Sequence, residues 1–160
     1  MSKTIPLTQG KEAVVDDCYY PMLVTVGKWC LQCNKYAASR IRGRLWLMHD
    51  LIMEWANGPM PKGKEVDHRN LDGLDNRLDN LRYATSSQNA FNKVKSTRNT
   101  SGYKGVFWHK GARKWMVQVK FHNVVHYVGL FASKDEAAIA YNTKASELSA
   151  EFARLNPISK

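Results

Sequence analysis

The strongest constraint on the fold is that the apolar residues of this chain come in short runs separated by turn-forming residues. No window of the 160 residues holds the roughly 18 consecutive apolar residues that a membrane-spanning helix needs. Three runs, at 13–20, 22–30 and 36–43, alternate apolar and polar residues, which predicts strands joined by short turns. The sequence therefore favours an α+β fold that begins with a β-rich section.

Helical spacing occurs in two places. Apolar residues recur on one side of 45–55, and this run stops at an Asn-Gly-Pro sequence, a typical end of a helix. Near the C-terminus, Ser133 and Glu136 have the spacing of a capping box and predict the start of a second helix. Two aromatic, β-branched runs, 106–121 and 124–131, precede that helix and predict a small sheet on which it packs.

Changes in composition divide the chain into four sections. Residues 1–60 form the β-rich section with its helix, and residues 61–92 are acidic, rich in Asn and poor in large apolar side chains. Residues 93–101 are polar, basic and without periodicity, which is typical of a linker. Residues 102–160 contain the sheet and the C-terminal helix. We expect these boundaries to separate the functional parts of the protein.

The net charge of +10 is concentrated in the last part of the chain. Residues 93–160 carry twelve basic and four acidic side chains, whereas residues 61–92 are neutral. A local basic block is expected of a protein that binds a phosphate backbone, although a merely solvated basic face would have the same composition. Seven of the eight cations in the acid-free stretch 93–120 are candidate DNA contacts: Lys93, Lys95, Arg98, Lys104, Lys110, Arg113 and Lys120.

Chemistry-bearing residues gather in the Asn-rich section. Asp67 and His68 end a predicted strand, where adjacent side chains point to opposite faces, and Asn89 lies on a short helix that Thr85 can cap. The oxygens of Asp67 and Asn89 are hard ligands that suit Mg²⁺ or Mn²⁺. Neutral His68, with a reference pKa near 6.5, could deprotonate a water molecule. The alternative without catalytic function is an Asx-rich surface loop with an ordinary surface histidine.

This section closely resembles the HNH nuclease motif, the ββα-metal fold, as found in phage and intron-encoded homing endonucleases. The likeness spans about 25 residues and includes the sequence LDNRLDNLR at 74–82. It implies that Asp67 and Asn89 bind the metal and that His68 is the general base. It also implies that Asn80 braces the loop and orients His68, and that cleavage leaves a 5′-phosphate and a 3′-hydroxyl.

The C-terminal section resembles the Apetala/ethylene-response-factor DNA-binding domain, a three-stranded sheet backed by one helix. The resemblance rests on SGYKGV at 101–106, YVGLF at 127–131, EAAIAYN at 136–142 and ARLN at 153–156. It implies that the sheet enters the major groove, which is wide enough for β-structure. The matching positions are Lys104, Phe107, His109, Gln118, Lys120, Val125 and Tyr127, with Phe107 and Val125 standing where Arg is usual. We expect Trp115 to belong to the core of this small domain.

The whole arrangement is similar to phage-type HNH proteins that join both modules. In those proteins an Arg commonly follows the histidine that corresponds to His49, whereas Asp50 follows it here. We interpret His49 as a structural residue and Asp50 as a surface or hinge residue, with a metal-ligand role for Asp50 as the alternative. Cys30 and Cys33 have half of a zinc-site spacing, but small, buried side chains are the simpler interpretation.

The sequence therefore predicts a Mg²⁺- or Mn²⁺-dependent HNH endonuclease, of the homing type, that cuts double-stranded DNA. A non-catalytic DNA-binding protein is the alternative, and RNA remains open as a substrate. The start of the chain lacks a signal-peptide core, and three cysteines indicate no disulfide framework, so we expect a cytoplasmic protein, in the host cell if a phage encodes it. One active site per chain predicts that a monomer nicks one strand.

Overall fold

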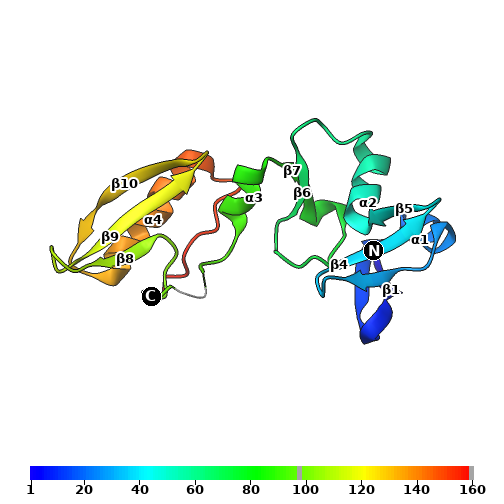
Figure 1. The fold of residues 1–160 in the computed structure, drawn as a ribbon, viewed down its shortest axis with the longest axis horizontal. Helices are drawn as coiled ribbons and strands as arrows, with labels where there is room; N and C mark the ends of the chain where they lie inside the picture. The colour runs from blue at the N-terminus through cyan, green and yellow to red at the C-terminus, as the bar shows by residue number, and fades with distance from the viewer. Residues whose placement is uncertain (97–98, 159–160) are drawn as a thin grey trace. The chain divides into compact units, whose positions relative to one another are not determined.

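Antiparallel strands and helices make up both parts of the chain in the computed structural model, which describes residues 1–96 and 99–158 (Figure 1). The chain divides into two units, residues 1–85 and residues 86–160, and we describe each by itself. The division falls inside the Asn-rich section, between its last strand and its helix. The α+β fold class is confirmed, whereas the four-section boundaries stay a prediction.

The first unit is built from three small antiparallel sheets and two helices. Its strands pair in the orders β1-β2, β3-β4-β5 and β6-β7. The elements are β1 (Ser2–Pro6), η1 (Thr8–Gly10), β2 (Glu12–Asp16), α1 (Tyr20–Val26), β3 (Cys30–Gln32), β4 (Tyr36–Ile41), β5 (Arg44–Leu47), α2 (Met48–Asn57), β6 (Glu65–His68), η2 (Leu78–Asn80) and β7 (Leu81–Ala84). Their apolar faces enclose one core, whose fully buried side chains include Val15, Leu23, Met48 and Ile52.

The strand predicted over residues 22–30 is wrong for most of its length, because Tyr20–Val26 forms the helix α1. Pro21 lies in the first turn, where its fixed φ angle and missing N–H are tolerated. Leu23 of α1 is fully buried, and its carbonyl accepts a hydrogen bond from the Trp29 indole at 2.8 Å. Burial of Leu23 therefore outweighs the strand preference of the β-branched residues beside it.

The helix predicted over residues 45–55 exists but begins at Met48, because Arg44–Leu47 pairs with β4 as strand β5. The turn between these strands is Arg42-Gly43, and both residues have positive φ angles, 49° and 80°. Two positive φ angles match the tight hairpin turns that preserve strand twist. The helix ends at Asn57 as predicted, and the Gly58 N–H closes it onto the Glu54 carbonyl at 2.9 Å.

The second unit is a three-stranded sheet with a long helix packed on one face, as predicted. It contains α3 (Ser86–Asn92), β8 (Val106–His109), β9 (Lys114–Phe121), β10 (Val124–Phe131) and α4 (Lys134–Ser149), and its strands lie in the order β10-β9-β8. Figure 1 shows α4 running along this sheet. Val117 and Val119 are completely buried on the face that α4 covers, because alternate residues of β9 share a face. Gln118 and Lys120 therefore belong to the opposite, outer face.

Helix α4 begins at the predicted capping box. The Ser133 hydroxyl accepts hydrogen bonds from the backbone N–H groups of Asp135 and Glu136, and the Glu136 carboxylate accepts one from the Ser133 N–H. Farther along, the ring of Tyr141 packs against Gly105, whose φ angle is +72°. A side chain at position 105 would collide with that ring, so glycine is required for the close packing of helix and sheet.

Candidate active site

Strand β6 places Asp67 and His68 side by side on opposite faces of the β6–β7 hairpin. Asp67 is 3% exposed and His68 is 5% exposed, so both polar side chains are buried. The strand ends at His68, as the sequence predicts. Across the hairpin, Asp67 pairs with Arg82 and His68 pairs with Leu81. The two residues therefore have different surroundings and can do different tasks.

A buried ion pair fixes the carboxylate of Asp67. Both Nε and Nη2 of Arg82 donate to Oδ2 of Asp67 at 2.8 Å, and Arg82 is itself only 7% exposed. Charge-assisted bonds of this kind define the orientation of a carboxylate closely. Sequence analysis did not assign Arg82 a role. Its position opposite Asp67 depends on the strand register, which the intervening loop determines.

Two aromatic rings and one amide surround the imidazole of His68. The Tyr36 ring stacks on it with ring centroids 5.8 Å apart, and the His49 ring meets it edge-on at 4.8 Å. The Asn76 carboxamide oxygen lies 3.3 Å from Nε2 of His68, and Asn76 is completely buried. Since Tyr36, His49 and Asn76 come from three different segments, the tertiary fold sets the plane of the His68 ring.

The hydrogen bonds of Asn76 also indicate which nitrogen of His68 carries the proton. The Asn76 Nδ2 group donates to the Leu74 carbonyl at 3.1 Å, so its Oδ1 atom is the one that faces His68. An amide oxygen accepts a hydrogen bond, so Nε2 of His68 carries the proton. A neutral His68 then has its lone pair on Nδ1, and Nδ1 is the atom that can accept a proton from water.

Burial keeps both histidines of this cluster neutral. It lowers the pKa of His68 below the ordinary value of 6.5, and it lowers the pKa of His49 to about 3, with repulsion from His68 and Lys35 adding to the shift of His49. Among the described residues, Nδ1 of His49 has no hydrogen-bond partner, while its Nε2 lies 3.5 Å from Asp50. His49 packs against the imidazole of His68, and its interpretation as a structural residue stays a prediction.

Asn80 braces the loop that connects the two strands. Its carboxamide accepts from the Asn70 N–H at 3.0 Å and donates to the Asn70 side chain at 3.0 Å and to the Asp75 carbonyl at 2.7 Å. Arg77 adds a bidentate pair to Asp75, with both bonds at 2.8 Å. Asn80 therefore makes contacts that brace the loop, while the amide described within hydrogen-bond distance of His68 is that of Asn76, to which the sequence motif assigned no role. The catalytic assignment of Asn80 stays a prediction.

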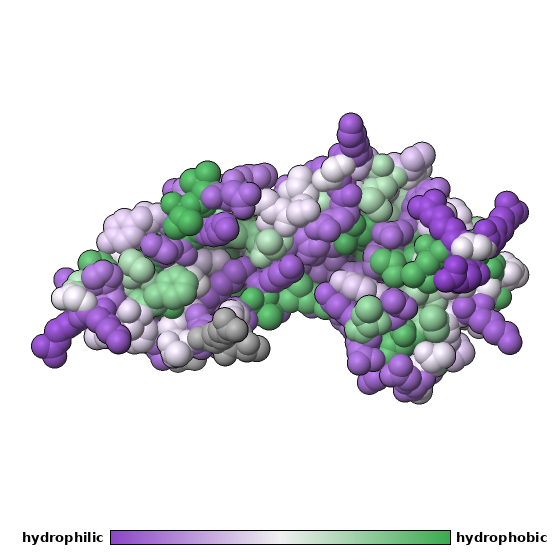
Figure 2. Space-filling model, in the orientation of Figure 1, coloured by the Kyte–Doolittle hydropathy of each residue, from purple (hydrophilic) through white to green (hydrophobic). Residues whose placement is uncertain are grey.

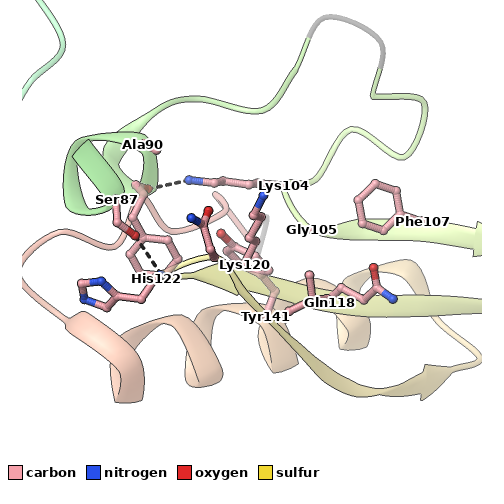
Figure 3. A pocket seen from close by; sticks show the side chains of 12 residues that line it. Ser87, Ala90, Lys104, Gly105, Phe107, Gln118, Lys120, His122 and Tyr141 are labelled. Atoms are coloured by element: carbon pink, nitrogen blue, oxygen red, sulfur yellow. Dashed lines mark hydrogen bonds between the residues drawn. The ribbon is translucent and has the colours of Figure 1, made fainter. Parts of the chain in front are cut away.

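The predicted second metal ligand, Asn89, lies on α3 in the other unit. Among the contacts that hold α3 in that unit, Ser87 Oγ accepts from the His122 N–H at 2.8 Å and Lys104 caps the helix (Figure 3). The buried Phe91 ring also packs on Phe121. The pairing of Asp67 with Asn89 stays a prediction. Their oxygen donors have the chemistry of a Mg²⁺ or Mn²⁺ site, which needs few protein ligands because the ion retains water.

Lys104 lies in a hollow of about 470 Å³ between α3 and the C-terminal sheet (Figure 3). Its ammonium group donates to the carbonyls of Phe91 at 2.5 Å and Lys93 at 2.8 Å. Burial, together with the charge of Arg154, lowers the pKa of Lys104 to about 8. The half-buried Lys104 therefore binds the end of a helix, a position suited to a cation, and its contact with DNA stays a prediction.

The outer face of the C-terminal sheet carries the other residues that the resemblance implied. Cross-strand pairing sets Val125 beside Lys120, Tyr127 beside Gln118, and Phe107 beside Met116. Tyr127 is 60% exposed and Val125 is 54% exposed, so apolar and polar groups alternate on an open face. In Figure 2, apolar patches lie among hydrophilic side chains on this unit.

The remaining candidate DNA contacts differ in what they bind. Lys93, Lys110 and Arg113 are exposed, whereas the Lys95 ammonium donates to the Gly102 carbonyl at 2.7 Å. The His109 ring accepts a hydrogen bond from the Ala112 N–H at 3.0 Å and so stabilises the β8–β9 turn. Arg98 lies outside the described residues. Trp115, expected in the core, is half-buried and packs edge-on against Trp108 with centroids 5.1 Å apart.

The cysteines form no zinc site in the described part of the chain. Within residues 1–96 and 99–158, no three His, Cys, Asp or Glu side chains gather where they could hold a metal ion. Cys30 is half-buried and its thiol donates to the Ala38 carbonyl at 3.3 Å. Cys33 is exposed in a turn, so its interpretation as a buried side chain is wrong. Nor does any described helix have the length and apolar character to cross a bilayer.

The sequence of this chain is similar to those of known proteins. A family model described as HNH endonuclease matches residues 47–91, which include α2, His49, β6, the braced loop, β7 and most of α3. Over 109 residues the chain is 38% identical to Protein 3.8 of Escherichia phage T7, an alignment that covers 66% of this chain and 87% of the phage protein. No solved structure matches the chain.

A second viral relative covers more of the chain. Over 144 residues the chain is 33% identical to the protein named Uncharacterized HNH endonuclease L560 of Acanthamoeba polyphaga mimivirus, covering 85% of this chain and 70% of that protein. The residues matched by the family model include the hairpin that carries the buried Asp67 and His68, and the alignments with both relatives extend over this part of the chain. The chain therefore belongs to the HNH endonuclease family.

Proposed function

We propose that this nuclease is a divalent-metal-dependent endonuclease of the homing type that hydrolyses phosphodiester bonds in double-stranded DNA. The observation that carries the proposal is the environment of His68, a buried imidazole whose pKa is lowered and whose Nε2 is occupied by Asn76. A histidine held in this way is ready to accept a proton at Nδ1 at neutral pH. A purely structural or DNA-binding role would not need that arrangement beside a fixed carboxylate.

In the proposed reaction, Nδ1 of His68 takes a proton from a water molecule as the water oxygen attacks phosphorus. The bond between phosphorus and the 3′ oxygen breaks, which leaves a 5′-phosphate and a 3′-hydroxyl once the leaving oxygen is protonated. Asp67 and Asn89 would hold Mg²⁺ or Mn²⁺, which would stabilise the charge that develops on the phosphate and the leaving oxygen. Arg82 keeps the Asp67 carboxylate in one orientation, and Tyr36 and His49 keep the His68 ring in its plane.

Binding of the duplex is assigned to the second unit, in which the excess of positive charge resides. The outer face of its sheet offers the exposed Lys120 and Tyr127 and the half-buried Gln118 as neighbours, with Val125 and Phe107 beside them. A β-sheet fits the major groove, in which amide and ammonium groups can reach base edges and phosphates. The sequence resemblance of this unit to the Apetala/ethylene-response-factor DNA-binding domain is in line with this assignment.

A cleavage assay tests the proposal. The full chain is incubated with supercoiled plasmid and Mg²⁺ or Mn²⁺, in parallel with EDTA and with the His68→Ala variant. Metal-dependent nicking by the parent, lost with EDTA and reduced by several orders of magnitude in His68→Ala, is the expected result. Binding without cleavage under every metal condition would instead favour a non-catalytic DNA-binding protein, and cleavage of RNA alone would change the substrate class.

A further inference from the structure

The turn between β4 and β5 concentrates positive charge in the first unit. Arg40, Arg42 and Arg44 lie within five residues, and all three are exposed. Residues 1–60 carry only seven basic and five acidic side chains, so the net charge of this part conceals the cluster. We refer to residues 40–44 as the arginine hairpin. Its tip is fixed by the two positive φ angles of Arg42 and Gly43.

An open hollow of about 640 Å³ lies beside the arginine hairpin. Its walls include the three arginines and, beneath them, apolar side chains that include Ile41, Trp46 and Trp55. In Figure 2, strongly hydrophilic side chains stand around an apolar patch at the right, the end of the first unit that carries β5 and α1 in Figure 1. The surface therefore combines guanidinium groups at its rim with an apolar floor.

No described carboxylate lies within ion-pair distance of the three guanidinium groups, although the charge of Arg44 does act on the carboxyl group of Asp50 from farther away. Among the described residues, none of the three arginines forms an ion pair, whereas Lys3 pairs with Asp17 at 2.8 Å and Arg82 pairs with Asp67. Arg40 instead donates to the Gly43 carbonyl at 3.0 Å, and Arg44 lies over the Trp46 ring, 4.1 Å from its centroid. These contacts order the side chains without cancelling their charge.

We propose that the arginine hairpin is a second DNA-binding surface, which contacts phosphates of the duplex from the first unit. The inference rests on the proposed function, because the partner is the DNA that the enzyme cleaves. Guanidinium groups match phosphate oxygens in geometry and are weakly hydrated. Arginines already ordered by a backbone carbonyl and an indole ring lose less conformational entropy when they bind, which favours a phosphate contact over a freely solvated face.

The salt dependence of duplex binding tests this inference. The full chain carrying His68→Ala, to prevent cleavage, is titrated onto a fluorescein-labelled mixed-sequence duplex between 50 and 300 mM salt. Each phosphate contact contributes roughly 0.9 to the slope of log affinity against log salt. Arg40→Gln with Arg42→Asn should therefore flatten the slope by roughly 1.8 and weaken binding about 60-fold at 0.1 M salt. Asn is chosen at position 42 because it tolerates a positive φ angle.

Two further variants test whether the change in salt slope arises from the arginine hairpin. Lys11→Gln with Lys62→Gln removes the same charge from exposed positions of the first unit outside this surface, and the slope should stay within about 0.3 of the parent. Arg42→Asn alone removes no described hydrogen bond and should flatten the slope by roughly 0.9. A parent-like slope in both arginine variants, or an equal change in the lysine variant, overturns the inference while the proposed function stands. Absence of any duplex binding by the parent overturns both.

Discussion

The buried pair between Asp67 and Arg82 predicts that removal of the carboxylate affects stability as well as catalysis. In Asp67→Ala, Arg82 loses the acceptor of two 2.8 Å bonds in a site where it is only 7% exposed. Removing one partner of a buried ion pair costs about 3–5 kcal/mol, because the remaining charge is left desolvated. A unit of 85 residues loses about 4–8 °C of melting temperature per kcal/mol, so the first unit should melt at least about 12 °C lower.

Asp67→Asn separates the two effects. Its amide oxygen can still accept from Arg82, so we expect a loss of only about 1–2 kcal/mol. Cleavage should nevertheless be abolished, because the charged ligand is gone. Thermal unfolding followed by circular dichroism, together with plasmid nicking, measures both quantities, and Asp79→Ala serves as an exposed control. An Asp67→Ala protein that melts within about 2 °C of the parent would refute the argument from burial.

Three further expectations follow from the pKa shifts and contacts. Since burial lowers the pKa of His68, its neutral form persists to lower pH, so the cleavage rate should rise through a midpoint below pH 6.5; a pH–rate profile with a midpoint above 6.5 would contradict this. His49 has a pKa of about 3 in the folded chain and 6.5 in the unfolded chain, so the unfolded chain binds more protons between these two pH values. Stability should therefore fall as the pH falls from 6.5 to 3, and urea unfolding across this range should show a weaker pH dependence in His49→Gln. Lys104→Met should lower the stability of the second unit and leave the salt slope of DNA binding unchanged, because Lys104 binds backbone carbonyls. Lys120→Gln should flatten that slope by roughly 0.9, and the reverse pattern of slopes would make Lys104 a phosphate contact.

Local sequence signals were sufficient to predict several elements of this molecule. The aromatic, β-branched runs at 106–121 and 124–131 predict the C-terminal sheet, because such side chains favour strands. The Ser133–Glu136 spacing predicts the start of α4, since a capping box involves only neighbouring residues. The Asp67-His68 pair at the end of β6 is equally local. These features need no information about distant parts of the chain.

Other features depend on residues that are distant in sequence. Arg82 reaches Asp67 across 15 residues only because the β6–β7 register sets them opposite each other. Asn76 and Asn80 both follow an Asp in the loop, and only the folded loop turns Asn76 toward His68 and Asn80 toward Asn70. The local sequence pattern does not predict which of these two asparagines contacts His68.

Burial decided the remaining differences between sequence and structure. Helix α1 forms in a β-branched segment because Leu23 is fully enclosed there, and Lys104 caps a helix because its stem is enclosed beside Phe91. Residue type and spacing thus predicted the C-terminal sheet, the capping box and the place of Asp67 and His68 at the end of a strand. The tertiary structure alone decided which polar partners meet, because the cost of burying an unpaired polar group is set by all the segments that surround it.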